Sequence, residues 1–298
     1  MKKSSWKGKT KADIVFDLIL VILCICVFFV IAYPLWFVII ASISDSNMVA
    51  TGQVILWPRN ISFFGFEQVF ADTRIWVGYR NTILYAGLGT AFSLLLTFPA
   101  AYVLSRKEFV ARRFLMLFFV FTMFFNGGMI PTFLLMRDVG FLNTIWVFII
   151  PFAVNIFNLI IVRTFFENSI PSELYDAAQL DGASHFYYFT RVVLPLSKAV
   201  IAIMVLYYLV QRWNDFFTGL IYIRDSSMQP LQVILRDILL AGQAMASGAG
   251  SVGAGYAQQY ANQIMYAVII VSTLPVLIVY PFIQKHFAKG VMVGAVKG

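Results

Sequence analysis

Long apolar stretches separated by short polar segments dominate the chain. Six of them are long enough to cross a bilayer, because a helix needs about 20 residues to span the roughly 30 Å hydrocarbon core. We expect helices in spite of the many Phe, Val and Ile residues, since a backbone in lipid must satisfy its hydrogen bonds internally. The sequence therefore predicts six transmembrane helices, at about residues 14–43, 80–104, 114–136, 144–166, 199–223 and 263–284.

Composition supports a membrane protein of one domain. Hydrophobic residues make up 60% of the 298 residues and charged residues 12%, whereas soluble domains average about 25% charged residues. The Lys-rich start precedes an apolar run much longer than the roughly 7 to 15 residues of a signal peptide, so we interpret that run as the first span. Prolines near or within the spans predict kinks that neighbouring helices must support: Pro34, Pro99, Pro131, Pro151, Pro275 and Pro281.

The distribution of positive charge predicts the orientation. The net charge of +8 does not come from a basic patch with interleaved aromatic residues, which argues against a nucleic-acid partner. Of the 22 Lys and Arg residues, with Arg80 and Arg163 at span ends counted with the adjoining side, 15 lie on one side of the six spans, 6 on the other and Arg212 within a span. All ten lysines are on the first side. The positive-inside rule then places both termini in the cytoplasm.

Motifs for catalysis or metal binding are missing from the sequence. Cys24 and Cys26 lie within an apolar run without a second ligand pair, and His185 and His286 are far apart. The glycines of the 248–255 stretch match a dinucleotide-binding spacing, but no strand precedes them. The chain has no phosphate-binding G-x-x-x-x-G-K-[ST] loop. We expect no catalytic residue, metal or cofactor in this chain.

The polar segment between the fourth and fifth spans, residues 167–198, predicts two short helices. Pro171 suits a helix approach, with Ser172 as N-cap, and Asp181-Gly182 is a turn after which Ala183-Ser184 begins the second helix. Glu173 and Asp176 share one face of the first helix, next to the small apolar residues Ala177 and Ala178. Such a projection suits docking to a partner with basic side chains, and the alternative is a solvated loop helix.

The segment has a fixed order of residues: Asp176-Ala177-Ala178, three further residues, Gly182, and then nine residues before Val192, Leu194 and Pro195, flanked by Pro171, Glu173, Asp181, Ala183 and Leu196. This spacing resembles the EAA loop of permeases from ATP-binding-cassette (ABC) importers. Two positions depart from the family pattern: Asp176, where the pattern usually has Glu, and Ala199, where a second Pro is common.

The resemblance extends from about residue 80 to the end of the chain. Trp213-Asn-Asp-Phe216 and the tail segments 284–290 and 294–298 are typical of carbohydrate (MalG-like) permeases. Segments 228–236 and 280–285 look most like the YtcP-like and LplC-like subgroup, which takes up oligosaccharides or complex polysaccharides.

This resemblance implies a fold, a location and partners. The fold is the all-α, six-helix, MetI-like fold of type I importers, in a bacterial inner membrane and in contact with its lipid. The partners are a second homologous permease, which completes a heterodimer, two ATPase subunits that bind ATP and Mg, and an extracytoplasmic solute-binding protein.

The resemblance also implies which residues couple transport to ATP. The 167–198 loop is expected to dock into a cleft on one ATPase through Glu173, Asp176, Ala177, Ala178, Asp181, Gly182, Ala183, Leu194 and Pro195. The tail is expected to contact the ATPase pair, with a frayed terminus as the alternative, through Lys289, Gly290, Gly294, Lys297 and Gly298.

Polar residues within spans are candidates for a substrate path, with structural contacts between helices as the alternative. In the fifth span, Arg212 and Asp215 are three residues apart and can neutralise one another. Their neighbours offer stacking faces and hydrogen bonds suited to a sugar. The full set of candidates is Asn126, Asn155, Asn158, Arg212, Trp213, Asn214, Asp215 and Phe216.

Two other classes of protein compete with the permease hypothesis. An ion-coupled secondary transporter or a channel needs intramembrane acids or inverted repeats, and Asp215 is the one carboxylate away from the ends of the predicted spans. A membrane-embedded enzyme needs a motif such as H-E-x-x-H or G-x-S-x-G, and the sequence has neither. We therefore predict that an importer driven by partner ATPases uses this chain as its permease, working by alternating access.

Overall fold

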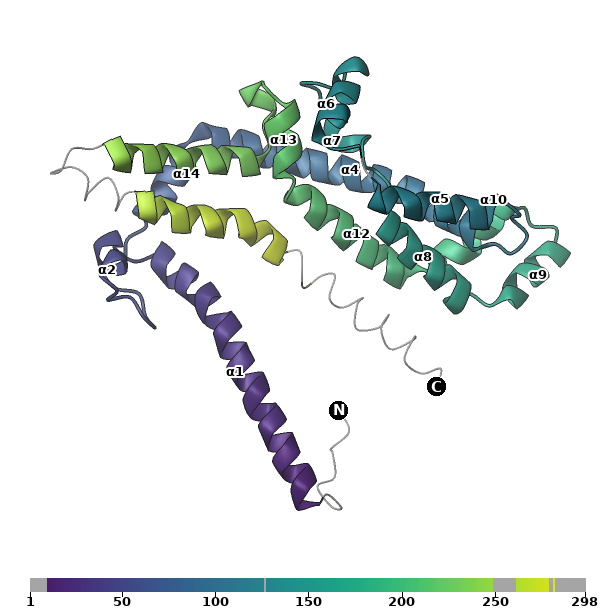
Figure 1. Cartoon of the computed structure of the whole chain (residues 1–298), viewed down its shortest axis with the longest axis horizontal. Coiled ribbons are helices and arrows are strands. Elements are labelled where there is room, and N and C mark those ends of the chain that lie inside the picture. Colours follow the sequence, from purple (N-terminus) through teal and green to yellow (C-terminus); the bar gives the residue numbers. More distant parts are fainter. Residues whose placement is uncertain (1–9, 126, 249–260, 279–280, 282–298) are drawn as a thin grey trace. The chain divides into compact units, whose positions relative to one another are not determined.

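The described part of the protein is helical, which confirms the predicted all-α class. The computed structural model (Figure 1) describes residues 10–125, 127–248, 261–278 and 281, and the tail residues Lys289, Gly290, Gly294, Lys297 and Gly298 lie outside these ranges. Within them the regular elements are helices, with one isolated antiparallel bridge between Ser44 and Ile61.

Three helices are individually long and apolar enough to cross a membrane: Ala12–Ser42, Thr73–Ser105 and Ala261–Ile278. Two bent pairs raise the possible number to five within the described residues: Arg112–Phe124 with Met129–Asp138, and His185–Leu196 with Lys198–Trp213. The predicted count of six spans stays a prediction.

The chain divides into two compact units. The first comprises Met1–Ala71 and Leu239–Val271, and the second Asp72–Ile238 and Ser272–Gly298. In the first unit, α1 (Lys11–Ser42) begins at a capping box in which Thr10 and Asp13 satisfy each other's backbone N–H. Two short helices follow, α2 (Ser46–Ala50) and α3 (Phe64–Ala71). Most apolar side chains of α1, together with both cysteines, are exposed, as expected for a surface that meets lipid or a partner.

A polar contact joins distant segments inside the first unit. The Gln263 side-chain amide donates to the Ser44 carbonyl at 3.4 Å and to the Ser62 hydroxyl at 3.0 Å. Gly65 packs against the same segment so closely that an added Cβ would lie 2.6 Å from the Gln263 carbonyl oxygen. The start of α3 therefore lies directly against the helix Ala261–Ile278.

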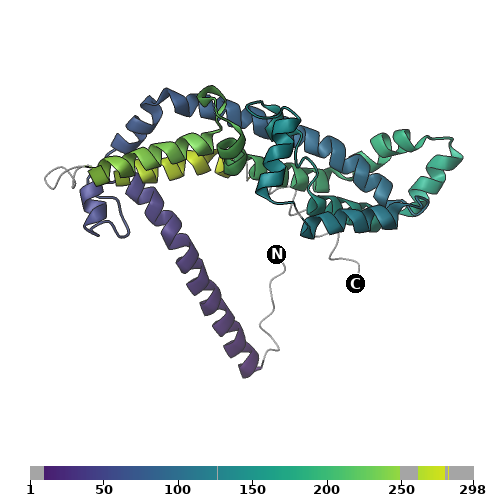
Figure 2. The ribbon, with the colours of Figure 1, turned by 45° about the horizontal axis from the view of Figure 1, so that its top comes forward.

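The second unit is built around α4 (Thr73–Ser105), the long blue helix in Figure 2. It packs along α8 (Ile156–Ser169) and α12 (Lys198–Trp213). Asp72 caps α4, so this helix begins seven residues before the predicted span at residue 80. Between these helices the Tyr208 hydroxyl bonds to the Thr97 hydroxyl at 2.7 Å. The core around this contact consists mainly of apolar side chains, including Phe98, Ala101, Leu159, Val162 and Met204.

Three predicted spans are interrupted, which corrects the expectation of one helix per apolar stretch. The third stretch consists of α5 (Arg112–Phe124) and α6 (Met129–Asp138), and Gly128 between them has a φ of +85°. The fourth consists of α7 (Trp146–Ile149) and α8, and Phe152 between them has a φ of +56°. Pro151 contributes to that break because its ring cannot continue a helix.

The fifth stretch breaks at two polar residues. Asn214 ends α12, and Asp215 caps α13 (Phe216–Tyr222) by accepting the Thr218 N–H at 3.2 Å. Asn and Asp favour such positions because their side chains replace the missing backbone partners. The Asn214-Asp215 pair is therefore the physical reason why this stretch is two helices.

The segment between the fifth and sixth predicted spans, near residues 224–262, contains a helix that the sequence pattern did not predict. After η2 (Ser226–Met228), α14 (Leu231–Gly248) packs its first turns on α4. The Asn81 amide of α4 donates to the Ser227 carbonyl at 2.8 Å, and the Thr82 hydroxyl accepts the Leu231 N–H at 2.8 Å. Buried Leu231, Ile234 and Leu235 give the i, i+3, i+4 pattern of one helix face.

We expect Gly78→Ala to destabilise the second unit. A Cβ on Gly78 would lie 2.9 Å from the Leu231 Cα, and a backbone atom cannot move aside without separating α4 from α14. Overpacking of this kind costs about 1–3 kcal/mol. The measurement is the thermal unfolding midpoint of the purified full-length chain in detergent, which should fall.

Gly87→Ala is the matched control in the same helix, because no atom lies within 4 Å of its added Cβ. This variant should unfold at the wild-type temperature or slightly above it, since alanine favours helices by about 0.5–1 kcal/mol over glycine. Equal midpoints for the two variants would contradict the close packing of α4 on α14.

Candidate functional site

The 167–198 loop forms the two predicted helices, with one difference at its start. The first helix is α9 (Ser172–Leu180), whose N-cap is Pro171; Ser172 is already the first helical residue, so the predicted Ser172 cap is wrong. Pro171 supplies no side-chain cap bond, and its fixed φ of −60° suits the entry to the helix.

The turn after α9 has the predicted residues and geometry. Gly182 has a φ of +73°, and the Ala183 N–H donates back to the Ala178 carbonyl at 2.9 Å. This left-handed closure favours glycine because other side chains meet the following carbonyl. Ser184 then caps α10 (His185–Tyr188) by accepting the Tyr187 N–H at 3.2 Å.

The second half of the loop continues from α10 toward α12. It contains η1 (Phe189–Val193), a π-helical turn, and α11 (Leu194–Leu196), and this segment meets α12 at an angle of 82°. At the bend, the buried Ser197 hydroxyl donates to the Val193 carbonyl at 2.7 Å. Residues 172–196 therefore form a bracket of short helices with one turn, at Asp181-Gly182.

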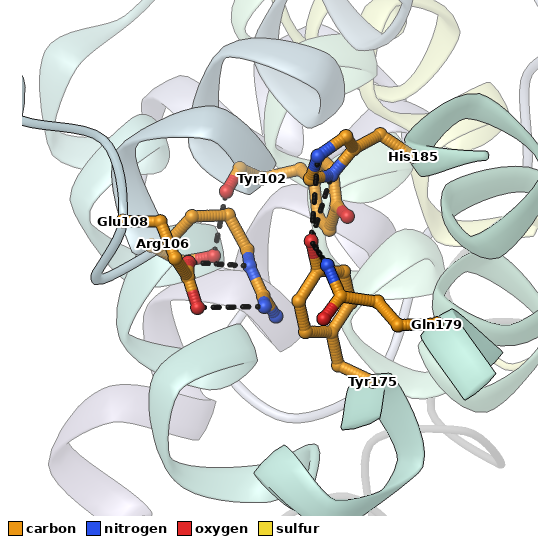
Figure 3. A network of polar contacts seen from close by, with 7 residues as sticks. Tyr102, Arg106, Glu108, Tyr175, Gln179 and His185 are labelled. Atoms are coloured by element: carbon orange, nitrogen blue, oxygen red, sulfur yellow. Dashed lines mark hydrogen bonds and ion pairs between the residues drawn. The ribbon is translucent and has the colours of Figure 1, made fainter. Parts of the chain in front are cut away.

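Tyr175 anchors α9 to the end of α4, as the close-up of this network shows (Figure 3). Its side chain is buried, and the guanidinium carbon of Arg106 lies 3.5 Å from the centre of its ring, a close cation–π contact. The Gln179 amide donates to the Tyr175 hydroxyl at 2.7 Å, and the His185 imidazole stacks on the same ring at a centroid separation of 5.5 Å. One side chain thus connects α9, α10 and the residue that follows α4.

The surroundings of this anchor hold Arg106 in place. Its guanidinium forms an ion pair with Glu108 at 3.2 Å. The backbone N–H of Glu108 and the charge of Arg106 hold the pKa of the Glu108 carboxyl below its usual range. Tyr188 contacts Tyr175 edge to face at 5.2 Å, and burial raises the pKa of the Tyr188 hydroxyl, which keeps it protonated.

With Tyr175 buried, most of the residues predicted to meet a partner are exposed. The half-buried members of that set are Ala178, Ala183 and Leu194. The exposed members are Glu173, Asp176, Ala177, Asp181, Gly182 and Pro195. No atom lies within 4 Å of the position that a Cβ on Gly182 would occupy, so another surface can approach the turn closely.

Apolar side chains flank this turn and were not identified from the sequence. Leu180 is 91% exposed and Phe186 is 76% exposed, on either side of the Asp181-Gly182 turn. The anchor residues Arg106, Tyr175 and His185 were also missed, because no motif marks a contact between segments 70 residues apart. The exposed Leu and Phe do carry a signal, since large apolar side chains on a polar turn favour a protein interface.

The predicted Arg212–Asp215 pair is not formed in the described part of the chain. The Arg212 guanidinium donates instead to the carbonyl of Phe148, near the end of α7, and lies 3.4 Å from the Ser93 hydroxyl. Gly89 leaves room for this contact, since a Cβ there would lie 3.1 Å from the Arg212 Nε. Asp215 is used as the cap of α13. Both side chains thus pair with backbone groups that a helix end leaves without an intrahelical partner.

The other path candidates also contact their own chain. Asn155 caps α8 by accepting the N–H of buried Asn158 at 3.2 Å. Trp213 is buried and donates its indole N–H to the Ser272 carbonyl at 3.0 Å, while exposed Asn214 donates to the Val210 carbonyl at 2.9 Å. Phe216 lies beneath Arg236 at 5.7 Å, and Asn126 is outside the described residues. Their role in a substrate path stays a prediction.

The chain is similar in sequence to known transport proteins. Residues 74–293 match the family model described as binding-protein-dependent transport system inner membrane component. The polygalacturonan/rhamnogalacturonan transport system permease protein YtcP of Bacillus subtilis is 40% identical over 285 residues, which cover 96% of this chain and 97% of YtcP. Protein LplC of the same organism is 38% identical over 289 residues, covering 97% of each chain.

A solved structure is similar over nearly the whole chain. It is a crystal structure of a bacterial ABC transporter involved in the import of the acidic polysaccharide alginate. The superposition has a TM-score of 0.83 at 34% sequence identity and covers 94% of this chain and 99% of that chain.

We expect Tyr175→Ala to release α9 from the end of α4. The variant loses a buried ring and its cation–π contact, which together stabilise the site by about 3 kcal/mol. Amide hydrogen exchange over residues 172–183 of the purified full chain should become at least tenfold faster.

Tyr187→Ala is the control, because Tyr187 belongs to the same loop and is exposed. Its exchange rates should match those of the wild type. Wild-type protection in the Tyr175 variant would show that α9 is held by something other than this anchor.

Proposed function

The chain belongs to the family of binding-protein-dependent transport system inner membrane components, and from this premise we propose how it couples to ATP hydrolysis and what it carries. It is the permease subunit of an ABC importer, a membrane protein that moves solute rather than a secondary transporter or channel. Its family is one of transporter permeases, which agrees with the expectation that this chain itself catalyses no reaction.

The complete importer, in our proposal, contains four further chains. A second homologous permease forms a heterodimer with this one, two ATPase subunits bind ATP and Mg, and an extracytoplasmic protein delivers the solute. The sequence supports the need for partner ATPases because it lacks the G-x-x-x-x-G-K-[ST] loop that binds nucleotide phosphates.

The 167–198 loop is the element that receives force from an ATPase. The observation that carries this proposal is the division of α9 into an inner and an outer side. Tyr175 is fixed to Arg106 on the inner side, while Asp176, Asp181 and Gly182 are exposed on the outer side. A projection can transmit movement only if its base is rigid and its tip is free to dock, and this helix has both properties.

The proposed orientation places this loop in the cytoplasm together with both termini. It rests on the excess of Lys and Arg on that side of the six predicted spans. In this orientation the tail residues Lys289, Gly290, Gly294, Lys297 and Gly298 are on the ATPase side, where the glycines allow close backbone approach and the lysines supply charge. The membrane is the bacterial inner membrane.

The solute is an oligosaccharide. This proposal rests on the 40% identity over nearly the full length with a permease for polygalacturonan and rhamnogalacturonan, and on the structural likeness to an importer of alginate. Acidic oligosaccharides are therefore the first compounds to test.

We expect Gly182→Val to assemble in the membrane and to lose ATP hydrolysis stimulated by the loaded binding protein, by about tenfold or more. The side chain would occupy the open space at the docking turn. Valine at a φ of +73° also strains the backbone by about 1–2 kcal/mol. The measurement is stimulated ATPase activity of the purified assembly in proteoliposomes.

Gly140→Val controls for the strain, because Gly140 has a φ of +78° and equally open surroundings in a different turn. It should keep stimulated activity. Gly182→Asn, which tolerates this backbone conformation, should retain more activity than valine. If Gly140→Val and Gly182→Val lose activity equally, strain rather than docking is the cause.

Affinity purification of the full chain from its native membrane in mild detergent should recover a second permease and a P-loop ATPase, identified by mass spectrometry.

Uptake of labelled oligogalacturonides should be lost in cells that lack only this chain and should return when it is supplied. A lone chain recovered in several detergents would contradict the assembly, and unchanged uptake would contradict the proposed solute.

A further inference from the structure

A cleft of about 860 Å³ lies beside the anchor of α9, within the second unit. Its walls come from the end of α4, the 106–113 segment that leads into α5, the end of α8 and the start of the 167–198 loop. Its volume is in the range of small-molecule sites, which is roughly 300–1,000 Å³. The coupling proposal uses the outer surface of α9, and of its docking residues Glu173 lines this cleft.

The charges in the cleft are unevenly balanced. Five basic and three acidic side chains line it. Arg106 and Arg163 are neutralised by ion pairs with Glu108 and Glu167, at 3.2 Å and 2.7 Å. In the part of the chain that the structure describes, the other basic residues form no ion pair, and Glu173 is the remaining carboxylate of the lining. The basic residues left without an acid are Lys107, Arg112 and Arg113.

Two buried hydroxyl groups in the wall also lack a partner. The Tyr102 and Tyr188 side chains are 7% and 1% exposed and line the cleft, and neither hydroxyl has a hydrogen-bond partner in the described structure. Buried polar atoms are nearly always hydrogen-bonded, so a ligand that brings an acceptor within reach of these two hydroxyls would satisfy them. Phenol, ammonium and guanidinium groups together form a set of donors. An anion with several acceptor oxygens, such as a phosphate ester, matches that set.

The position of the cleft distinguishes among phosphate-bearing ligands. Arg112 and Arg113 open α5, and the next turns of this helix expose a stripe of large apolar side chains. Residues spaced by three or four lie on one helix face, so the stripe runs away from the basic pair along α5. It consists of Phe114, Leu117, Phe118 and Phe121. An acyl chain can lie along such a stripe while its headgroup lies in the cleft.

We propose that this cleft binds the headgroup of an anionic phospholipid, with a phosphate oxygen at the Lys107, Arg112 and Arg113 side chains and an acyl chain along α5. The proposed orientation puts the 106–113 segment at the cytoplasmic boundary of the membrane, where anionic lipids attract basic residues. Basic pockets between transmembrane helices on that side bind lipid headgroups by the same physical attraction. The bound lipid would thereby contact the base of the bracket that holds α9.

The test is native mass spectrometry of the purified importer assembly, titrated with phosphatidylglycerol and, separately, with phosphatidylcholine. The wild type should retain phosphatidylglycerol in preference to phosphatidylcholine. Arg112→Gln combined with Arg113→Gln should bind phosphatidylglycerol about tenfold more weakly, because two charges that attract the headgroup are lost. Arg112→Lys with Arg113→Lys should bind within about threefold of the wild type, since the charge is kept.

The matched control is Arg59→Gln combined with Arg224→Gln, which removes the same charge from two exposed arginines outside the cleft. It should bind phosphatidylglycerol like the wild type. Tyr102→Phe combined with Tyr188→Phe removes only the two unpaired hydroxyls and should also weaken binding. If the two hydroxyls contact no ligand, the double phenylalanine variant should bind phosphatidylglycerol like the wild type and should be no less stable.

Three results would overturn the proposal. Wild-type binding by the Arg112 and Arg113 glutamine variant would show that the lipid lies elsewhere. Displacement of phosphatidylglycerol by equal concentrations of inorganic phosphate would identify a site for free anions. Loss of the ATPase subunits from that variant with unchanged lipid binding would identify an interface with an acidic protein surface. Lipid retention is measured without transport, so its failure would leave the importer proposal intact.

Discussion

Unpaired backbone groups in apolar surroundings are the constraint on which the second unit depends. Each interruption of a helix leaves N–H and C=O groups without intrahelical partners, and lipid offers none. Arg212 donates to the Phe148 carbonyl near the end of α7, and Asp215 accepts the Thr218 N–H at the start of α13. The Tyr208 hydroxyl is 3.3 Å from the Asn155 N–H at the start of α8. The polar residues of the spans thus allow short helix segments to replace continuous ones.

The helix α4 connects these contacts with the 167–198 loop, which we propose docks to an ATPase. Gly89 and Ser93 border the Arg212 guanidinium, Thr97 bonds to Tyr208, and Tyr102 packs against Phe189 at 5.0 Å. Arg106, directly after the helix, holds Tyr175. Because one helix borders both the broken spans and α9, the proposed displacement of the loop would be shared with the helices around the break points.

The cleft and the outer face of α9 are two sides of the same bracket. Its inner residues face a basic cleft at the end of α4, and its outer residues present Leu180, Phe186 and two carboxylates, Asp176 and Asp181. Apolar and charged groups in combination suit recognition by a protein surface, whereas a donor-rich cleft suits an anion. The membrane and the ATPase would then act on one structural element from opposite sides.

Sequence patterns alone determined the helical class, the apolar stretches, the two helices around Asp181-Gly182 and the resemblance to importer permeases, because helix length, turn chemistry and motif spacing are local properties. They did not reveal the Arg106–Tyr175 anchor, α14 against Gly78, or the capping role of Arg212 and Asp215. These three features depend on which distant segments of the chain meet. Spacing along one helix had suggested an Arg212–Asp215 pair. Only the tertiary structure decided otherwise, since the Phe148 carbonyl, freed at a helix break, needs a donor more than Asp215 does, whose carboxylate already accepts the Thr218 N–H.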